Sequence, residues 1–330
     1  AMGLKFGIWF EPEMISPDSD LYREHPDWAI SIPGRVGNLC RNQYVLDLSR
    51  KEVRDHAFES VAAVLHSANI EYVKWDMNRQ LSDLGSMDLP ADRQGEVFHR
   101  YILGVYDLYE RLNTAFPQIL FESCASGGGR FDPGILYYAP QGWTSDDTDA
   151  AERVKIQYGT SMCYPVSSMG SHVSVVPNHQ LNRKTPLHTR ANVAYFGTFG
   201  YELDLNKLSD EEISEVKQQI TFMKEYRELI QFGTFYRLKS PFEGNETVWM
   251  TVSEDKKTAL VFWYRERNVV NADFTRVRLQ GLDPDLIYRN EYNGTENYGD
   301  ELMNLGLLTT DCTAGEPTSE DEPCTDYESR

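Results

Sequence analysis

Basic residues are scarce in this sequence, which has 32 Lys and Arg against 51 Asp and Glu and a net charge of −19. Nucleic acids and anionic membranes bind through basic patches, so neither is expected as a partner. Long apolar runs are also missing, since none approaches the roughly 20 residues of a membrane-spanning helix. No signal peptide is visible, because the first residues lead directly into a strand-like segment.

Cysteine is sparse and odd in number. The five residues are Cys40, Cys124, Cys163, Cys312 and Cys324. No pair has the spacing of a zinc site, and the density is far below that of a disulfide scaffold. We therefore expect a reducing compartment, a cytoplasmic location, no metal and no cofactor.

Short apolar runs alternate with helix-like stretches over the first two thirds of the chain. The runs span residues 5–10, 44–48, 71–75, 119–122, 141–144 and, more weakly, 169–173. This alternation predicts a parallel sheet buried on both faces. Each run ends in a polar or glycine-rich loop, and charged residues at several strand ends suit the mouth of a (β/α)8 barrel better than the crevice of a doubly wound sheet.

The rest of the chain has a different pattern. Amphipathic helices are predicted over Gln94–Ala115 and over Ser209–Ile230, the second with Ser209 as N-cap in a capping box. From Phe232 onward, short alternating strands separated by turns predict a small antiparallel β-sandwich. We expect residues 1–231 to form the barrel, 232–308 the antiparallel domain, and 309–330 an acidic, disordered tail.

The first chemical candidate is the segment from Lys74 to Arg79. Side chains alternate along a strand, so Lys74, Asp76 and Asn78 point the same way. The positive charge of Lys74 should lower the pKa of Asp76 and keep it ionised. An ionised, positioned carboxylate suits a glycosidase nucleophile, although a structural ion pair at a strand end explains these residues equally well.

The second candidate is the acidic loop that follows Trp143. It places Asp146, Asp147 and Asp149 within four residues, and their mutual repulsion should raise the pKa of at least one. A raised pKa is what a general acid requires. Asp149 fits the N-cap of the following helix, which leaves Asp146 or Asp147 as the candidate acid.

The third candidate is the glycine-rich loop from Ser123 to Arg130. Its glycines allow a ligand to approach the backbone closely, but they match no phosphate-binding spacing. We interpret Cys124 in this loop as a packing or contact residue, because no histidine with a clear role lies near it in sequence. Softer signals are Trp9, as a possible wall of a sugar pocket, and Arg41, as a donor to hydroxyl groups.

Together these motifs resemble glycoside hydrolase family 36, the bacterial-type α-galactosidases. The matching segments are FGIWFEPEM (6–14), RNQYVLDLS (41–49), YVKWDMN (72–78), FESCASGGGRFD (121–132), WTSDDTD (143–149) and MGSHVS (169–174). The resemblance implies that Asp76 is the nucleophile and Asp146 the acid/base of a retaining hydrolase, with carboxyl groups about 5–5.5 Å apart. It also implies a galactose pocket lined by Trp9, Arg41, Lys74, Asn78, Cys124, Gly127 and Trp143.

The resemblance further implies α-galactoside oligosaccharides as substrates and a homo-oligomeric protein. In this family register the chain covers strands three to eight, so we expect a barrel that lacks its first two β/α units. Two alternatives stay open: an inactive or weakly active carbohydrate-binding fragment, and an enzyme that transfers galactosyl groups with the same two carboxylates.

Overall fold

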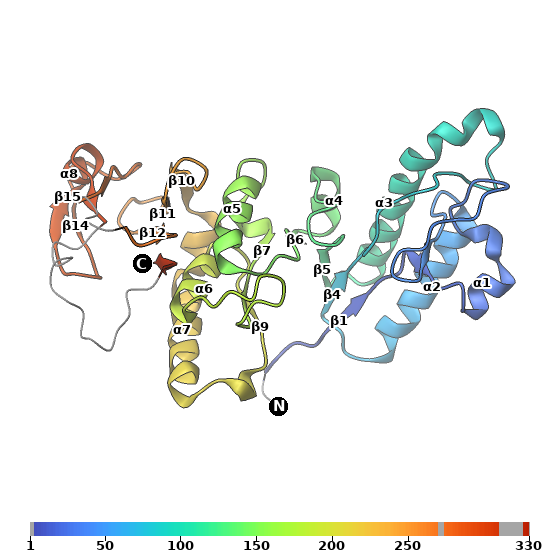
Figure 1. Ribbon diagram of the computed structural model, residues 1–330, viewed down its shortest axis with the longest axis horizontal. Helices are drawn as coiled ribbons and strands as arrows, with labels where there is room; N and C mark the ends of the chain where they lie inside the picture. The colour runs from blue at the N-terminus through green and yellow to red at the C-terminus, as the bar shows by residue number, and fades with distance from the viewer. Residues whose placement is uncertain (1–2, 270–273, 310–325, 330) are drawn as a thin grey trace. The chain divides into compact units, whose positions relative to one another are not determined.

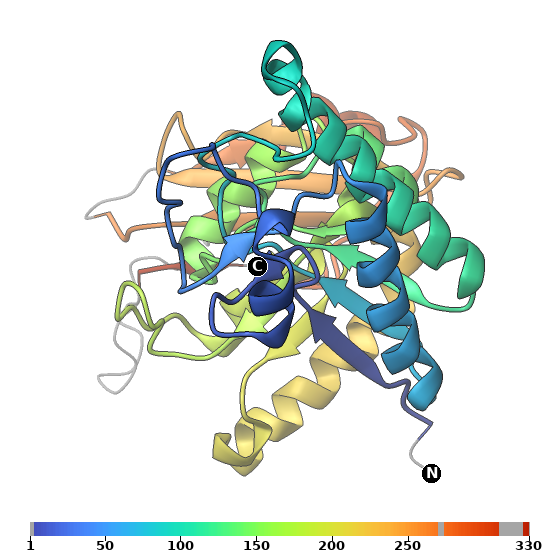
Figure 2. The same ribbon diagram turned by 90° about the vertical axis from the view of Figure 1, so that its right-hand side faces the viewer.

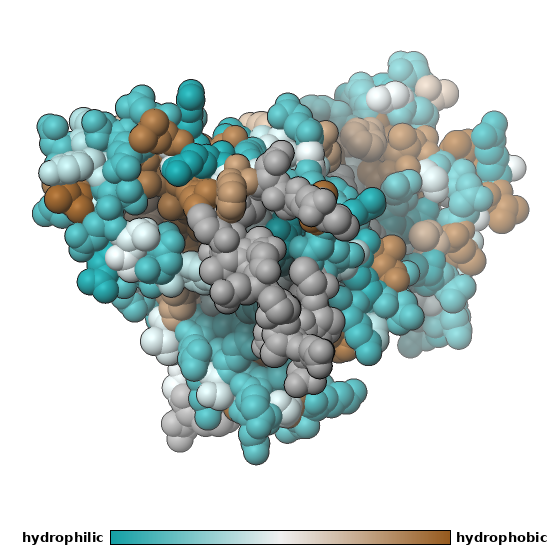
Figure 3. All heavy atoms as spheres, turned by 60° about the vertical axis from the view of Figure 1, so that its left-hand side comes forward, coloured by the Kyte–Doolittle hydropathy of each residue, from teal (hydrophilic) through white to brown (hydrophobic). Residues whose placement is uncertain are grey.

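The structure is a computed structural model that describes residues 3–269, 274–309 and 326–329. It divides into two compact units, Ala1–Asp146 and Asp147–Arg330. Across the described ranges, no helix is long and apolar enough to cross a lipid bilayer. On the face that Figure 3 shows, hydrophilic side chains predominate and hydrophobic ones form small separate groups.

The first unit is built on a parallel sheet whose strands pair in the order β1, β4, β5, β6 (Figure 1). These strands are β1 (Gly7–Phe10), β4 (Tyr72–Trp75), β5 (Leu120–Ser123) and β6 (Gln141–Trp143). The register places Lys74 beside Trp9 on one side and beside Glu122 on the other. Because parallel strands end at the same edge of a sheet, the candidate loops after β1, β4, β5 and β6 gather at one edge.

Two long helices cover this sheet, and Figure 2 shows them next to each other. The helices of the unit are α1 (Asp20–Glu24), α2 (Lys51–Ser67), α3 (Val97–Ala115) and α4 (Pro133–Tyr138), with 3₁₀ helices at η1 (Pro26–Trp28) and η2 (Ala91–Glu96). Helix α3 presents Tyr101, Leu108 and Tyr109 to the core at helical spacing. Tyr109 stacks on Trp75 of β4, with the ring centroids 4.3 Å apart.

One predicted barrel strand is wrong. The segment 44–48 contributes only β3 (Tyr44–Val45), which pairs antiparallel with β2 (Met14–Ile15), whereas β1 pairs directly with β4. An apolar run shows that a segment is extended and buried, but it does not show which strand it pairs with. Conversely, β9 (Gly200–Glu202), which pairs in parallel with β8 (His172–Ser174), escaped prediction because it is short and half exposed.

The second unit joins parallel β/α elements to an antiparallel sheet. Its helices are α5 (Ala150–Thr160), α6 (Leu187–Tyr195), α7 (Asp210–Phe232) and α8 (Gly299–Asn304), with 3₁₀ turns at η3 (Val166–Ser168) and η4 (Leu205–Lys207) and a short strand β7 (Met169–Gly170). The predicted caps are present, since Asp149 accepts from the Glu152 N–H at the start of α5 and Ser209 forms the capping box of α7.

The predicted antiparallel β-domain has two layers. One is a four-stranded sheet of β10 (Thr234–Lys239), β11 (Glu246–Val252), β12 (Ala259–Arg265) and β17 (Glu328–Ser329), and the other consists of the pairs β13 (Arg276–Val277) with β16 (Leu307–Leu308) and β14 (Ile287–Arg289) with β15 (Glu296–Tyr298). Strand β11 alternates: Val248 and Met250 face the core shared with Val277 of the second layer, and Trp249 faces the opposite core.

The end of the chain departs from the predicted disordered tail. Residues 310–325 and 330 of that tail lie outside the described residues, but Thr309 and Asp326–Ser329 are described, and for the segment Asp326–Ser329 the expectation is wrong. Strand β17 pairs with β12. The guanidinium carbon of Arg183 lies over the Tyr327 ring, 5.0 Å from the ring centroid. The acidic composition of the tail does not predict this pairing, because only one aromatic residue, Tyr327, holds the segment Asp326–Ser329 in place.

Candidate active site

Asp76 lies directly after strand β4, and three nitrogen donors converge on its carboxylate. Trp9 Nε1 donates to Oδ2 over 3.2 Å, Asn78 Nδ2 donates to the same oxygen over 2.7 Å, and the Met77 N–H donates to Oδ1 over 2.8 Å. The residue is only 6% exposed. The predicted common face of Asp76 and Asn78 is therefore present, and Trp9 from β1 reaches the same carboxylate.

The pKa of Asp76 is lowered although the side chain is buried. Burial by itself raises the pKa, but hydrogen bonds from the Cys124 thiol, Asn78, Trp9 and the Met77 backbone outweigh it. The carboxylate is therefore ionised at neutral pH. Conversely, burial and the adjacent Asp76 raise the pKa of the Cys124 thiol, so the thiol keeps its proton and acts as a donor.

Lys74 has a different role from the one that the sequence predicts. Its ammonium pairs with the buried Glu122 carboxylate at 3.4 Å and lies 4.7 Å from the centroid of the Trp143 ring. The prediction that its charge lowers the pKa of Asp76 is wrong, because hydrogen bonds have that effect. A sequence shows which side chains share a strand face, but it does not show that the neighbouring strand supplies a nearer carboxylate.

Asp146 follows strand β6, and its side chain is exposed. Trp143 Nε1 donates to its Oδ1 over 3.0 Å. Asp147 differs, because its Oδ1 accepts the backbone N–H of Asp149 at 3.0 Å and so helps to shape the turn before α5. Of the two aspartates that the sequence left as alternatives, Asp146 is the more accessible. The predicted rise in the pKa of one loop carboxyl stays a prediction.

The glycine-rich loop contacts the carboxylate of Asp76 and the backbone of Asp146. Its Cys124 is 2% exposed and hydrogen-bonds Asp76. Three residues further on, Gly127 has φ of +79°, and a Cβ there would lie 2.6 Å from Ser145 Cα and 2.8 Å from Asp146 N. Only glycine fits such a contact without strain. The loop thus fixes the backbone of Asp146 relative to the side chain of Asp76.

Glu11 is a site residue that the sequence analysis did not assign. Its Oε1 accepts from Asn78 Nδ2 and also from Arg41 Nη1 at 3.4 Å. Arg41 itself is exposed and has a left-handed backbone, with φ of 52°. Glu11 therefore connects two predicted sugar-binding residues from separate loops. A carboxylate two residues after Trp9 was the only sequence signal that could have found it.

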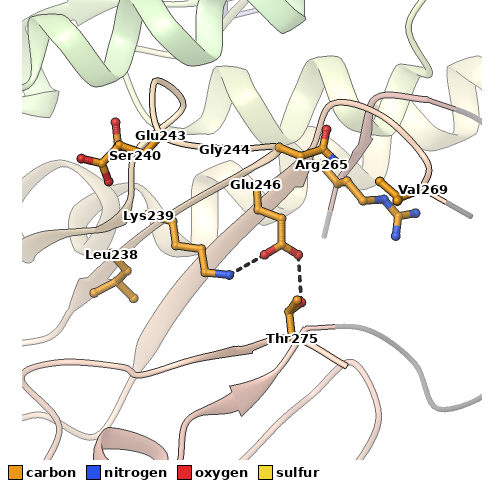
Figure 4. Close-up of a pocket in the computed structure, with 10 residues that line it drawn as sticks. Leu238, Lys239, Ser240, Glu243, Gly244, Glu246, Arg265, Val269 and Thr275 are labelled. Atoms are coloured by element: carbon orange, nitrogen blue, oxygen red, sulfur yellow. Dashed lines mark hydrogen bonds and ion pairs between the residues drawn. The ribbon is translucent and has the colours of Figure 1, made fainter. Parts of the chain in front are cut away.

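A pocket of about 490 Å³ lies elsewhere, in the antiparallel sheet of the second unit (Figure 4). The carboxylate of Glu246 dominates it. Lys239 pairs with this carboxylate, and Thr275 and Trp263 donate to it over 3.0 Å each. Because these polar groups satisfy one another, the network stabilises the sheet, and none of the predicted site residues belongs to it.

Family models cover most of the chain. The melibiase model matches residues 1–233, and the model of the glycosyl hydrolase family 36 C-terminal domain matches residues 246–330. α-Galactosidase AgaA of Geobacillus stearothermophilus is 56% identical over 306 residues, which are 93% of this chain and 42% of the relative. α-Galactosidase Mel36A of Lactobacillus acidophilus is 56% identical over 92% of this chain and 42% of its own length.

Solved structures show the same likeness. The crystal structure of AgaA superimposes with a TM-score of 0.93 and 52% identity, covering 99% of this chain and 44% of that one. The α-galactosidase of Lactobacillus brevis gives a TM-score of 0.94 and 51% identity, with coverage of 99% and 44%. These matches confirm the predicted fold class, and the chain spans less than half the length of the relatives it matches. The chain belongs to the melibiase family, within glycoside hydrolase family 36.

Proposed function

We propose that this chain carries the two catalytic carboxylates of a retaining α-galactosidase, which removes terminal α-D-galactosyl groups from oligosaccharides. The observation that carries this proposal is the state of Asp76, a buried carboxylate kept ionised by converging donors. One glycine loop contacts both this side chain and the backbone of Asp146. Crystal structures of AgaA variants contain raffinose or stachyose, which supports the same substrate class.

In the proposed mechanism, Asp76 attacks the anomeric carbon while Asp146, in its protonated form, donates a proton to the glycosidic oxygen. The bond to the leaving group breaks as the ester to Asp76 forms. Asp146 then takes a proton from water, and the water oxygen displaces Asp76 from the anomeric carbon with net retention of configuration. Accessibility suits Asp146 for this exchange, and low pKa suits Asp76 for attack.

The remaining site residues are proposed to bind the sugar. Asn78 and Lys74 are directed at hydroxyl groups, because each is already oriented by a carboxylate, Glu11 and Glu122 respectively. Trp9 is half exposed and offers a ring for the apolar face of a pyranose. The other proposed contacts are Arg41, Cys124, Gly127 and Trp143.

The test is hydrolysis of p-nitrophenyl α-D-galactoside by this chain, with Asp76→Ala as control. The proposal predicts release of nitrophenol by the unaltered chain only, and NMR of the first-formed sugar should show the α-anomer. Equal rates for the two proteins would instead favour a carbohydrate-binding fragment. Products longer than the substrate, dominating at low acceptor concentration, would favour galactosyl transfer over hydrolysis.

The cellular location and the oligomeric state are also proposals. We propose a cytoplasmic location, because the described cysteines, Cys40, Cys124 and Cys163, are all free thiols and two of them are exposed. We also propose a homo-oligomer, which sedimentation of the purified protein would test.

A further inference from the structure

Glu13 is a fully buried carboxylate in the loop between β1 and β2, with 0% exposure. Trp75 Nε1 donates to its Oε1 over 2.7 Å. Its Oε2 accepts the Tyr101 hydroxyl and pairs with Arg130 Nη1 at 2.7 Å. A carboxylate this deeply buried is stable only when such donors surround it.

Two of these partners adjoin the candidate active site. Trp75 is the last residue of β4 and immediately precedes Asp76. Arg130 ends the glycine-rich loop that contains Cys124. Glu13 therefore connects strand β4, which precedes the proposed nucleophile Asp76, to the end of the glycine-rich loop. The Cys124 thiol of that loop donates to Asp76.

Arg130 depends on Glu13. Its side chain is only 10% exposed, and its Nε and Nη2 atoms are buried with no hydrogen-bond partner among the described residues. The ion pair with Glu13 is thus the main compensation for burying the guanidinium. Without it the cation would move toward water and would pull the end of the loop with it.

We propose that Glu13 is a positioning residue that, through Arg130 and Trp75, seats the glycine-rich loop so that Cys124 contacts Asp76. The effect on catalysis rests on the proposed function, whereas the seating of the loop does not. Glu13 touches neither of the proposed catalytic carboxylates in any described contact, so it acts only through its partners.

Loop seating is measured by the reactivity of the Cys124 thiol. Replacing the other four cysteines by serine leaves Cys124 as the single thiol, and its 2% exposure predicts slow labelling by dithiobis(nitrobenzoate). The double variant Glu13→Gln/Arg130→Met removes both charges, so that no cation is left unpaired. We expect it to fold, as judged by circular dichroism and thermal melting, yet to label at least about tenfold faster because the loop opens more often.

Kinetics supply the second readout. In the folded double variant we expect kcat to fall, up to the order of 10²-fold that a misplaced catalytic group costs. The acidic limb of the kcat/KM profile should also move to higher pH, because Asp76 loses the thiol donor. A merely structural role for Glu13 would lower stability and leave this limb in place.

Glu246→Gln is the matched control, because Glu246 also accepts from an indole N–H and pairs with a cation, Lys239, but outside the candidate site. It should change neither labelling nor kcat. Unchanged labelling in the folded double variant, or a kcat equal to that of the unaltered chain, would overturn the proposal. If the unaltered chain hydrolyses no α-galactoside, the proposed function fails, and the labelling rates still decide whether Glu13 seats the loop.

Discussion

Gly127 lies directly against the backbone of Asp146, so close that a Cβ on Gly127 would be 2.8 Å from the Asp146 nitrogen. The same loop donates the Cys124 thiol to Asp76. The separation of the two carboxylates therefore depends on a backbone-to-backbone contact that tolerates no side chain. For a double displacement at one carbon, that separation decides whether both groups reach the glycosidic bond.

Gly127→Ala should lower both stability and activity. The added Cβ meets backbone atoms of Ser145 and Asp146, and φ of +79° is strained for alanine. We expect a loss of about 1–3 kcal/mol in the free energy of unfolding and a fall in kcat, measured by denaturant melts and by p-nitrophenyl α-D-galactoside hydrolysis. The control is Gly95→Ala, where a Cβ meets nothing within 4 Å. Equal behaviour of the two variants would contradict the contact.

Glu11→Gln should weaken substrate binding. Its carboxylate orients Asn78 and attracts Arg41, and Gln keeps the shape but loses the charge. We expect kcat/KM to fall about tenfold, or roughly 1.4 kcal/mol, mainly through KM. Glu24→Gln, which alters an exposed carboxylate at the end of α1, serves as control. A drop confined to kcat would show that Glu11 acts on the chemical step instead.

Cys124→Ala should move the pH dependence of activity. The thiol is one of the donors that lower the pKa of Asp76, so its removal raises that pKa. Asp76 must be ionised to attack, and the acidic limb of kcat/KM should therefore shift to higher pH. Stability follows the same sign: a lowered folded pKa stabilises above the unfolded pKa of about 3.9, and this contribution is lost as pH falls through the folded pKa. An unmoved limb would show that the thiol donates nothing to Asp76.

Lys74→Met should destabilise the protein, because it leaves Glu122 buried at 3% exposure without its cation. Removing one partner of a buried ion pair typically lowers the free energy of unfolding by about 3–5 kcal/mol. Because the Lys74 side chain is partly exposed, we expect a loss at the low end of that range. Adding Glu122→Gln should recover most of the loss in denaturant melts but not the lost sugar binding. A single variant as stable as the unaltered chain would contradict the pairing.

The sequence predicted the strand ends that carry Asp76 and Asp146, because continuous apolar runs and the polar residues that follow them are local signals. It could not predict which residues touch those carboxylates. The donors to Asp76 come from β1, from the loop after β5 and from its own strand end, and only the fold brings them together. For the same reason it assigned Lys74 to Asp76 when Glu122 on the neighbouring strand is the partner.

The sequence also could not predict which strands pair with each other. The apolar run at 44–48 was taken for a barrel strand, but Tyr44–Val45 pairs antiparallel with Met14–Ile15. Glu13 shows the same limit. A glutamate directly before an apolar pair predicts a loop residue. Its burial follows instead from contacts with Trp75 and Arg130, which lie 62 and 117 residues further along the chain.

Azide rescue of Asp76→Gly tests the assignment of the two carboxylates most directly. Azide entering the space left by the side chain attacks the anomeric carbon from the side on which Asp76 lay, and p-nitrophenolate leaves from the opposite side, where Asp146 is still present. We predict that the variant is almost inactive toward p-nitrophenyl α-D-galactoside, that azide restores its activity, and that the product is the β-galactosyl azide. An α-galactosyl azide, as Asp146→Gly should give, or an Asp76→Gly variant as active as the unaltered chain, would show that Asp76 is not the nucleophile.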